Sequence, residues 1–201
     1  MKRVIIGPVA TLAVATLCTA SVDILGAVAA GGPPVLAKQL APARGGSRIT
    51  VTSSAFSGGG TIPDQNTQNG EDMSPALAWT KGPPGTRSYV VLAEDAGVDG
   101  KDPIVHWVMY DISLAITRLA AGIAPDAKFE FGSQGKNIAG KTGYIGPKPP
   151  AGETHPYHFE VFALNTRLNL DPAKADRDTI VAAMKGKVLA SGDLIGNYTG
   201  K

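Results

Sequence analysis

The chain has 201 residues, of which 43% are hydrophobic, with 25 glycines, 15 prolines and a formal net charge of +2. This apolar content excludes a disordered chain, and a chain of this length buries roughly 70% of its unfolded surface without needing disulfides. Its basic residues are scattered, without a run of five or more, which excludes the electrostatic signature of a nucleic-acid-binding protein. Length and composition therefore predict one globular domain with many turns.

The N-terminus has the pattern of a secretory signal peptide. Lys2 and Arg3 precede an almost uncharged apolar stretch over 4–22, and small residues cluster just before residue 31. We predict a cleaved leader at 1–30, a secreted or periplasmic protein and no stable membrane span after cleavage. Two alternatives stay open, because the stretch is long enough for a retained membrane anchor and the only cysteine, Cys18, could carry a lipid.

The segments that follow alternate between short apolar runs and loops. Residues 31–48, rich in Gly, Pro and Ala, are predicted to form a flexible linker, which leaves 49–201 as the folded domain. Apolar or alternating runs predict strands at 48–52, 77–79, 88–94, 104–112 and 157–164, and a short apolar pair stands at 194–195. Gly- and Pro-rich stretches predict loops at 57–60, 63–70 and 132–152.

One helix is predicted over 178–187, where Ile180, Val181 and Met184 lie at helical spacing. Several strands, turn-rich loops and few helices predict a mostly β fold, a β-sandwich with a few peripheral helices. The chain shows no βαβ alternation, no P-loop and no HExxH motif.

Three polar residues stand at informative places on the predicted strands. Asp95 follows the strand that begins at 88, His106 lies within an apolar strand, and His155 precedes the strand that begins at Tyr157. Because strand side chains alternate between faces, His155 and Tyr157 are expected to share one wall, and His158 is expected on the opposite face. The same rule places His106 with Val108, Tyr110 and Ile112.

These residue types fit a site for a small anion. Imidazole and phenol groups donate hydrogen bonds to phosphate oxygens, and the Gly-rich loop 143–147 would add backbone N–H donors. A carboxylate such as Asp95 beside two histidines favours their protonated forms. Simpler interpretations stand beside this one: a lone histidine in an apolar strand is more often a core residue, and an Asp/His/His set could bind a metal, although the spacing matches no metal motif.

Six stretches of the sequence resemble the phosphatidylethanolamine-binding (Raf-kinase-inhibitor-like) family. Five are Asp-Met-Ser-Pro-Ala-Leu-Ala-Trp at 72–79, Pro-Gly-Thr-Arg-Ser at 84–88, Val-His-Trp-Val at 105–108, the Gly-Tyr-Ile-Gly-Pro-Lys-Pro-Pro-Ala-Gly loop at 143–152, and His-Pro-Tyr-His-Phe at 155–159. The sixth, Gln-Gly-Lys-Asn at 134–137, resembles the bacterial branch of the family. The order of these motifs is also that of the family, and the resemblance runs from about residue 49 to residue 198.

The resemblance implies a β-sandwich with a small anion pocket, and its members are described as binding phospholipid or inhibiting kinases or serine proteases. Carried over by motif, the pocket residues are Asp95, His106, Gly146, Pro147, His155 and Tyr157. The sequence departs from the family where a second acid is lost or displaced to Asp99. Gln68 and Lys148 also stand where cysteines are common, which removes a disulfide.

We therefore expect a non-enzymatic binding module, without cofactor or metal, whose partner is a small anionic ligand or a phospholipid head group. A first alternative is an inhibitor or regulator of a kinase or protease that docks a protein partner. A second is a hydrolase that uses His106 or His155 as general base, with or without a metal. Nucleophilic serine chemistry has little support, since no GxSxG motif surrounds Ser74 or Ser133.

Overall fold

The computed structural model describes residues 1, 33–98 and 102–201. The predicted leader at 1–30 and Asp99 lie outside the described residues. None of the helices in the described part combines the length and the apolar character needed to span a membrane.

Two β-sheets form the body of the protein. The larger has seven strands in the order β1-β10-β9-β4-β5-β8-β7, and the smaller has three in the order β2-β3-β6. The strands are β1 (Ser47–Arg48), β2 (Val51–Thr52), β3 (Leu77–Trp79), β4 (Ser88–Asp95), β5 (Ile104–Ser113), β6 (Arg118–Leu119), β7 (Lys128–Phe129), β8 (Gly132–Gln134), β9 (Thr154–Leu164) and β10 (Val188–Thr199). The helices are α1 (Ala37–Leu40) and α2 (Arg177–Met184), with 3₁₀ turns η1 (Arg44–Gly46) and η2 (Asp64–Asn66).

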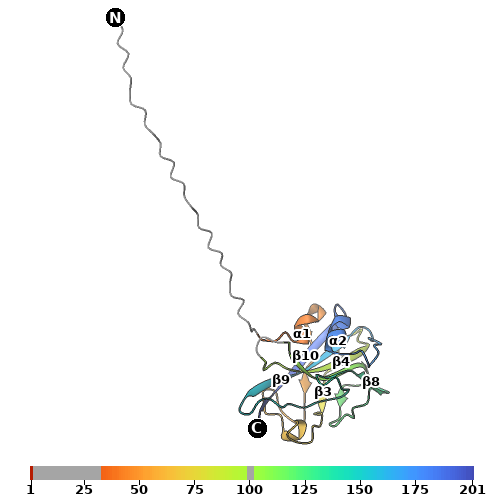
Figure 1. The fold of residues 1–201 in the computed structure, drawn as a ribbon. Helices are drawn as coiled ribbons and strands as arrows, with labels where there is room; N and C mark the ends of the chain where they lie inside the picture. The colour runs from red at the N-terminus through yellow and green to blue at the C-terminus, as the bar shows by residue number, and fades with distance from the viewer. Residues whose placement is uncertain (2–32, 99–101) are drawn as a thin grey trace.

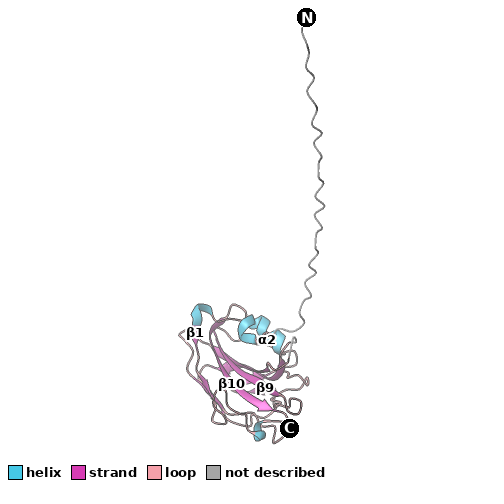
Figure 2. Cartoon of the chain, turned by 90° about the vertical axis from the view of Figure 1, so that its left-hand side faces the viewer, coloured by secondary structure: helices cyan, strands magenta, loops and turns pink. Residues whose placement is uncertain are grey.

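The larger sheet is covered on both faces. The helices α1 and α2 lie together on one side of it and the small sheet lies on the other (Figure 1). A core rich in aromatic residues, including Trp79, Trp107 and Phe159, fills the space between the two sheets. A second core, which includes Leu92, Phe162 and Ile180, lies beneath the helices. The predicted mostly β sandwich with peripheral helices is confirmed, and a view at right angles shows the strands dominating the fold (Figure 2).

The segment predicted as a flexible linker is in part folded. Leu36, Ala37 and Ala41 are buried, and β1 pairs in parallel with β10. High Gly, Pro and Ala content predicts flexibility, but small side chains also allow the chain to lie close against a sheet. The folded domain therefore begins before residue 49.

Strand β10 is the element that sequence patterns missed. Only the apolar pair at 194–195 was noticed, yet the strand runs from Val188 to Thr199 and pairs with β9 along its length. Its glycines explain the omission, since Gly normally signals a turn. Here a Cβ on Gly192 would lie 2.0 Å from the Ile49 carbonyl oxygen, and one on Gly196 would lie 2.6 Å from Ile62. The glycines allow close backbone approach within a strand.

The single predicted helix exists as α2. Its N-cap is Asp176, whose side chain accepts a hydrogen bond from the Thr179 N–H at 2.9 Å. It begins one residue before the predicted start and ends three residues before the predicted end, ahead of Gly186, which has a φ of 70°.

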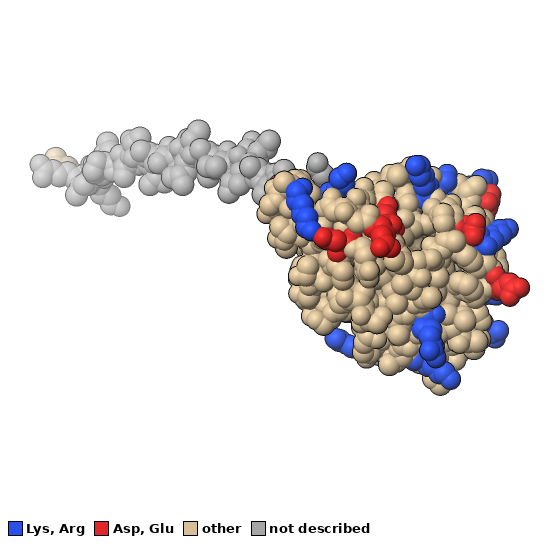
Figure 3. All heavy atoms as spheres, turned by 90° about the horizontal axis from the view of Figure 1, so that it is seen from below, with Lys and Arg blue, Asp and Glu red and all other residues tan. Residues whose placement is uncertain are grey.

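On the face shown in Figure 3 the basic side chains are dispersed among uncharged areas rather than gathered into one patch.

Candidate functional site

A bulge in β5 sets the position of His106. Ala93 pairs with Trp107 and Glu94 with Val105, so that His106 is an extra residue between two registered pairs. The bulge turns His106 toward the face where it meets Tyr157, with ring centroids 5.2 Å apart. The expectation that His106 shares a face with Val108 and Tyr110 is therefore wrong, since those two pack in the core beneath the helices.

His155 and Asp95 form a close pair between neighbouring strands. His155 Nδ1 lies 2.9 and 3.1 Å from the two carboxylate oxygens of Asp95, and its Nε2 lies 3.3 Å from Glu153 Oε2. Burial opposes a charge on the ring, but the hydrogen bonds to Asp95 and Glu153 outweigh it and raise the pKa of His155. The carboxylates at both ring nitrogens therefore favour the protonated, imidazolium form of His155.

Gly97 supports this pair from the chain that follows β4. Its N–H donates to Asp95 Oδ1 at 2.7 Å, and a Cβ at this position would lie 2.2 Å from His155 Cγ. Only glycine fits against the imidazole ring here. The residue thus fixes the carboxylate and leaves room for the ring at the same time.

His106 is held in the opposite charge state. Its Nδ1 lies 2.6 Å from the carbonyl oxygen of Ile145, while the Ile145 N–H donates to the His106 carbonyl at 3.0 Å. A carbonyl can only accept, so Nδ1 carries the proton and Nε2 of the neutral ring is an acceptor. Burial lowers the pKa of His106 despite the nearby charge of Asp95. Nε2 is buried and has no hydrogen-bond partner among the described residues.

Tyr157 presents a second unpartnered polar atom. The side chain is buried next to both histidine rings, and its hydroxyl forms no hydrogen bond within the described part of the chain. Burial and the charge of Asp95 raise the pKa of Tyr157 well above its usual range, so the hydroxyl keeps its proton. Buried polar atoms normally have partners, and two neighbouring exceptions point to an absent one.

A cavity of about 640 Å³ opens over this group, here called the front site (Asp95, His106, His155 and Tyr157). Asp95, His106 and His155 line it directly, while Tyr157 lies behind the histidine rings. Lys148 and Glu153 bring opposite charges to its wall, and Ile104 and Ile138 add apolar surface. Ile138 is 60% exposed, an unusual state for a large aliphatic side chain at a cavity.

Gly146 and Pro147 do not line the cavity, although the family resemblance implied that they belong to it. The N–H of Gly146 donates to Asp72 Oδ1, and its carbonyl accepts from Gln68 Nε2 at 2.7 Å. The Pro147 carbonyl accepts from the Gln68 N–H at 3.1 Å. This loop holds His106 through Ile145 and joins the loop 63–70, and the N–H groups of Ile145 and Gly146 are engaged within the protein instead of facing a ligand.

Sequence reasoning also missed part of the cavity wall. Glu153, Lys148 and Gln68 line it, and only the last two were noticed, as replacements of cysteine. Gln68 joins the two loops by its hydrogen bonds to Gly146 and Pro147. Glu153 stands two residues before His155, and this spacing places both side chains on one side of an extended chain. The spacing is a signal from which Glu153 could have been predicted as a site residue. His158 lies on the opposite face, as expected, with Nδ1 2.8 Å from Asp193 Oδ2.

Comparison with known proteins agrees with this geometry. A family model described as phosphatidylethanolamine-binding protein matches residues 52–199. A UPF0098 protein of Aquifex aeolicus is 37% identical over 158 residues, which cover 77% of this chain and 90% of that protein. A UPF0098 protein of Methanothermobacter thermautotrophicus is 36% identical over 151 residues, 75% of this chain and 98% of that one.

Two crystal structures share the fold. A phosphatidylethanolamine-binding protein homologue from Chlamydia trachomatis superposes with a TM-score of 0.68 at 32% identity, covering 77% of this chain and 99% of its own. Escherichia coli YbcL superposes with a TM-score of 0.71 at 24% identity, covering 77% of this chain and all of its own, which concerns the fold alone. The matched region contains both sheets from β2 onward and every residue of the front site, and the chain belongs to the phosphatidylethanolamine-binding protein family.

Proposed function

We propose that the protein binds a small anion of the phosphate type, such as a phosphate monoester or a phospholipid head group, in the cavity over the front site. The observation that carries the proposal is the pair of buried, unpartnered atoms, His106 Nε2 and the Tyr157 hydroxyl, beside the imidazolium of His155. The Tyr157 hydroxyl can donate a hydrogen bond to the anion. His106 Nε2 accepts while the ring is neutral and donates once the ring is protonated, and the His155 imidazolium brings positive charge.

Glu153 supports the idea that His155 offers a hydrogen bond to an anion. Its carboxylate lies 3.3 Å from His155 Nε2, although its side chain is 61% exposed and free to turn into solvent. A phosphate oxygen could take this place and meet the same N–H. Lys148, on the same wall, would add a further charge near the ligand.

Binding without catalysis is the form of the proposal that the lining favours. No Ser, Thr or Cys side chain is among the described residues that line the cavity, so a hydroxyl or thiol nucleophile has no candidate there. We also infer that the protein acts outside the cytoplasm, on the strength of its N-terminal sequence. Mass analysis of the protein from its native host should then find a mature N-terminus between about residues 26 and 36.

The test of the proposed function is calorimetric titration with sulfate, whose charge is constant, and with glycerol 3-phosphate. His155→Ala should weaken binding of both at least about tenfold, because a charge-assisted hydrogen bond is lost. His158→Ala, on the same strand but on the opposite face, is the matched control and should bind as the wild type does. Equal affinity of all three proteins would reject the front site as the binding site.

The charge states of the two histidines predict how binding depends on pH. Neutral His106 presents an acceptor at Nε2, so an anion bound there favours protonation of the ring, and binding should take up protons. His155 loses its charge as the pH rises through its raised pKa. Sulfate affinity should therefore fall as the pH rises through the raised pKa of His155, by at most about tenfold per pH unit for each linked proton. Titration in buffers of different ionisation enthalpy measures the uptake, and pH-independent binding with no uptake would contradict this assignment.

A further inference from the structure

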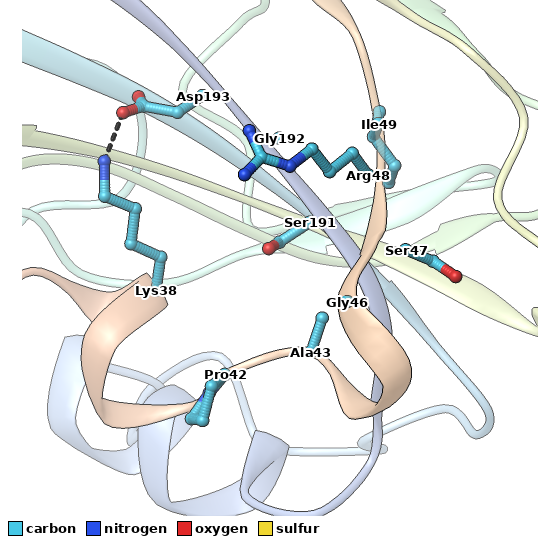
Figure 4. A pocket seen from close by; sticks show the side chains of 10 residues that line it. All are labelled: Lys38, Pro42, Ala43, Gly46, Ser47, Arg48, Ile49, Ser191, Gly192 and Asp193. Carbon is cyan, nitrogen blue, oxygen red and sulfur yellow. Dashed lines mark hydrogen bonds and ion pairs between the residues drawn. The ribbon is translucent and has the colours of Figure 1, made fainter.

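A second cavity, of about 570 Å³, lies between the segment that follows α1 and strand β10. It shares no lining residue with the cavity over the front site. Figure 4 shows two basic side chains at this second cavity, with Arg48 extending over β10 toward Lys38 and Asp193, and Ser191 lying between the two basic residues. Its floor is a paired strand, because Arg48 stands opposite Ser191 in the register of β1 and β10.

Arg48 is the group in this cavity that lacks a partner. Among the described residues, no carboxylate lies within ion-pair distance of the Arg48 guanidinium, and no hydrogen bond involves the Arg48 side chain. Arginine is always charged, and its planar fork matches the oxygens of a carboxylate or a phosphate. The hydroxyls of Ser47 and Ser191 are likewise without hydrogen bonds in the described part of the chain.

The single acid that lines the cavity is already compensated. Asp193 Oδ2 accepts a hydrogen bond from Lys38 Nζ and lies 2.8 Å from His158 Nδ1. Burial would favour its neutral form, but these two partners outweigh burial and hold the pKa of Asp193 below its usual range. Because its charge is balanced by Lys38, the uncompensated charge at the cavity is the positive one of Arg48.

The other wall is apolar. Pro42 and Ala43 come from the segment between α1 and η1, and Ile49, which is buried, follows β1. The volume is within the range of cavities that hold small organic molecules, and it exceeds what a bare inorganic anion fills. The lining thus combines a fixed positive charge, hydroxyl groups and an apolar wall.

We propose that this second cavity binds a small organic anion, a carboxylate or a phosphate monoester, with Arg48 as its principal contact. Lys38 and Ser191 supply further donors, and the apolar part of the ligand lies against Pro42 and Ile49. The site is separate from the front site and does not depend on the function proposed for it.

The proposal is tested by NMR titration of the ¹⁵N-labelled protein with phenyl phosphate and with benzoate. Either probe should shift the backbone amide signals of Ser191 and Gly192, and the probe with the higher affinity identifies the acid group preferred. Arg48→Gln should weaken this binding at least about tenfold without changing the melting temperature, because Arg48 forms no ion pair to lose.

The matched control is Arg118→Gln, since Arg118 is also an exposed arginine on a two-residue strand without an ion pair in the described structure. It should bind both probes as the wild type does, and so should His155→Ala when the Ser191 and Gly192 signals are followed. The proposal is overturned if neither probe moves those signals, if Arg48→Gln binds as tightly as the wild type, or if His155→Ala abolishes the shifts.

Discussion

Two polar groups lie back to back on the same strands of the large sheet. Asp95 and Tyr157 are opposite each other in the register of β4 and β9, and the next pair in this register is Glu94 and His158. The first pair belongs to the front site, with Asp95 on the cavity wall and Tyr157 behind the histidine rings. The second faces the helices and belongs to a rear cluster formed by Lys38, Glu94, His158, Glu160, Arg177 and Asp193.

The rear cluster differs from the front site in having a cover. The N–H groups of Ala37 and Lys38 donate to Glu94 and Glu160, at 2.9 and 3.3 Å, and Arg177 binds both Glu94 and the carbonyl oxygen of Val35. Glu160 Oε1 and Asp193 Oδ1 form no hydrogen bond among the described residues, but Glu160 Oε1 lies 4.0 Å from Lys38 Nζ, and the Asp193 carboxylate is paired with Lys38 through Oδ2. The comparison teaches that similar residue types become structural when a chain segment supplies their partners, and become a candidate ligand site when none does.

The largest effect that would sharpen this contrast is expected from Arg177→Met. Arg177 is the cationic partner of the fully buried Glu94, and removal of one member of a buried ion pair typically costs about 3–5 kcal/mol of unfolding free energy. Urea denaturation at pH 7 measures this loss. Arg118→Met is the control and should change stability by less than about 0.5 kcal/mol. Sulfate affinity should stay unchanged, and a stable Arg177→Met variant would mean that the rear cluster is not structural.

An intermediate effect, confined to the front site, is expected from Gly97→Ala. The added methyl group overlaps the His155 ring, so the ring must leave Asp95. Sulfate binding, measured by calorimetry, should weaken by about tenfold to a hundredfold as the charge-assisted contact is lost. Gly58→Ala is the matched control, because its nearest contact would be at 3.8 Å, an ordinary distance. If Gly97→Ala binds sulfate normally, His155 is not a ligand contact.

The smallest effect concerns the pH dependence of stability in Glu160→Gln. Burial, with the neighbouring charge of Glu94, raises the pKa of Glu160 to about 9. The folded protein thus keeps a proton that the unfolded chain releases near the ordinary value, so this group makes stability fall as pH rises from about 4.5 to 9. Glutamine keeps the shape and cannot lose a proton.

Denaturation at pH 7 and at pH 8 measures this difference. Relative to wild type, Glu160→Gln should be more stable at pH 8 than at pH 7 by about 1 kcal/mol, the value for one linked proton over one pH unit. Glu130→Gln, at an exposed carboxyl without an ion pair in the described structure, serves as the control and should leave this slope nearly unchanged. A wild-type and a Glu160→Gln curve of the same slope would show that Glu160 is ionised in the folded protein.

Period-two alternation predicted part of the site correctly from the sequence. It placed His155 and Tyr157 together and His158 behind them, because β9 has no bulge at these residues. It misplaced His106, because a bulge in β5 interrupts the alternation there and leaves no mark in the order of polar and apolar residues. The family resemblance still identified His106 as a site residue, because a sequence motif does not depend on the local backbone geometry.

Features that depend on tertiary contacts could not be predicted from the sequence. The residues of the rear cluster come from α1, β4, β9, α2 and β10, and nothing in the spacing of Lys38, Glu94 and Asp193 indicates that they meet. The same limit applies to β10, whose glycines look like turns until the neighbouring chain is known to lie against them. Local patterns report on local structure, and these features depend on pairings more than fifty residues apart in the chain.

The position of β10 also has a consequence for how the protein is made. This strand is the last in the sequence and yet lies inside the large sheet, with β9 on one side and β1, some 140 residues earlier, on the other. A ribosome or a translocation channel that has released only the first 187 residues holds a chain whose β9 edge is open. Such a chain exposes unpaired backbone groups that invite pairing with other chains. The large sheet can therefore close only after β10 has emerged, and distant pairings such as that of β1 with β10 make the search slow.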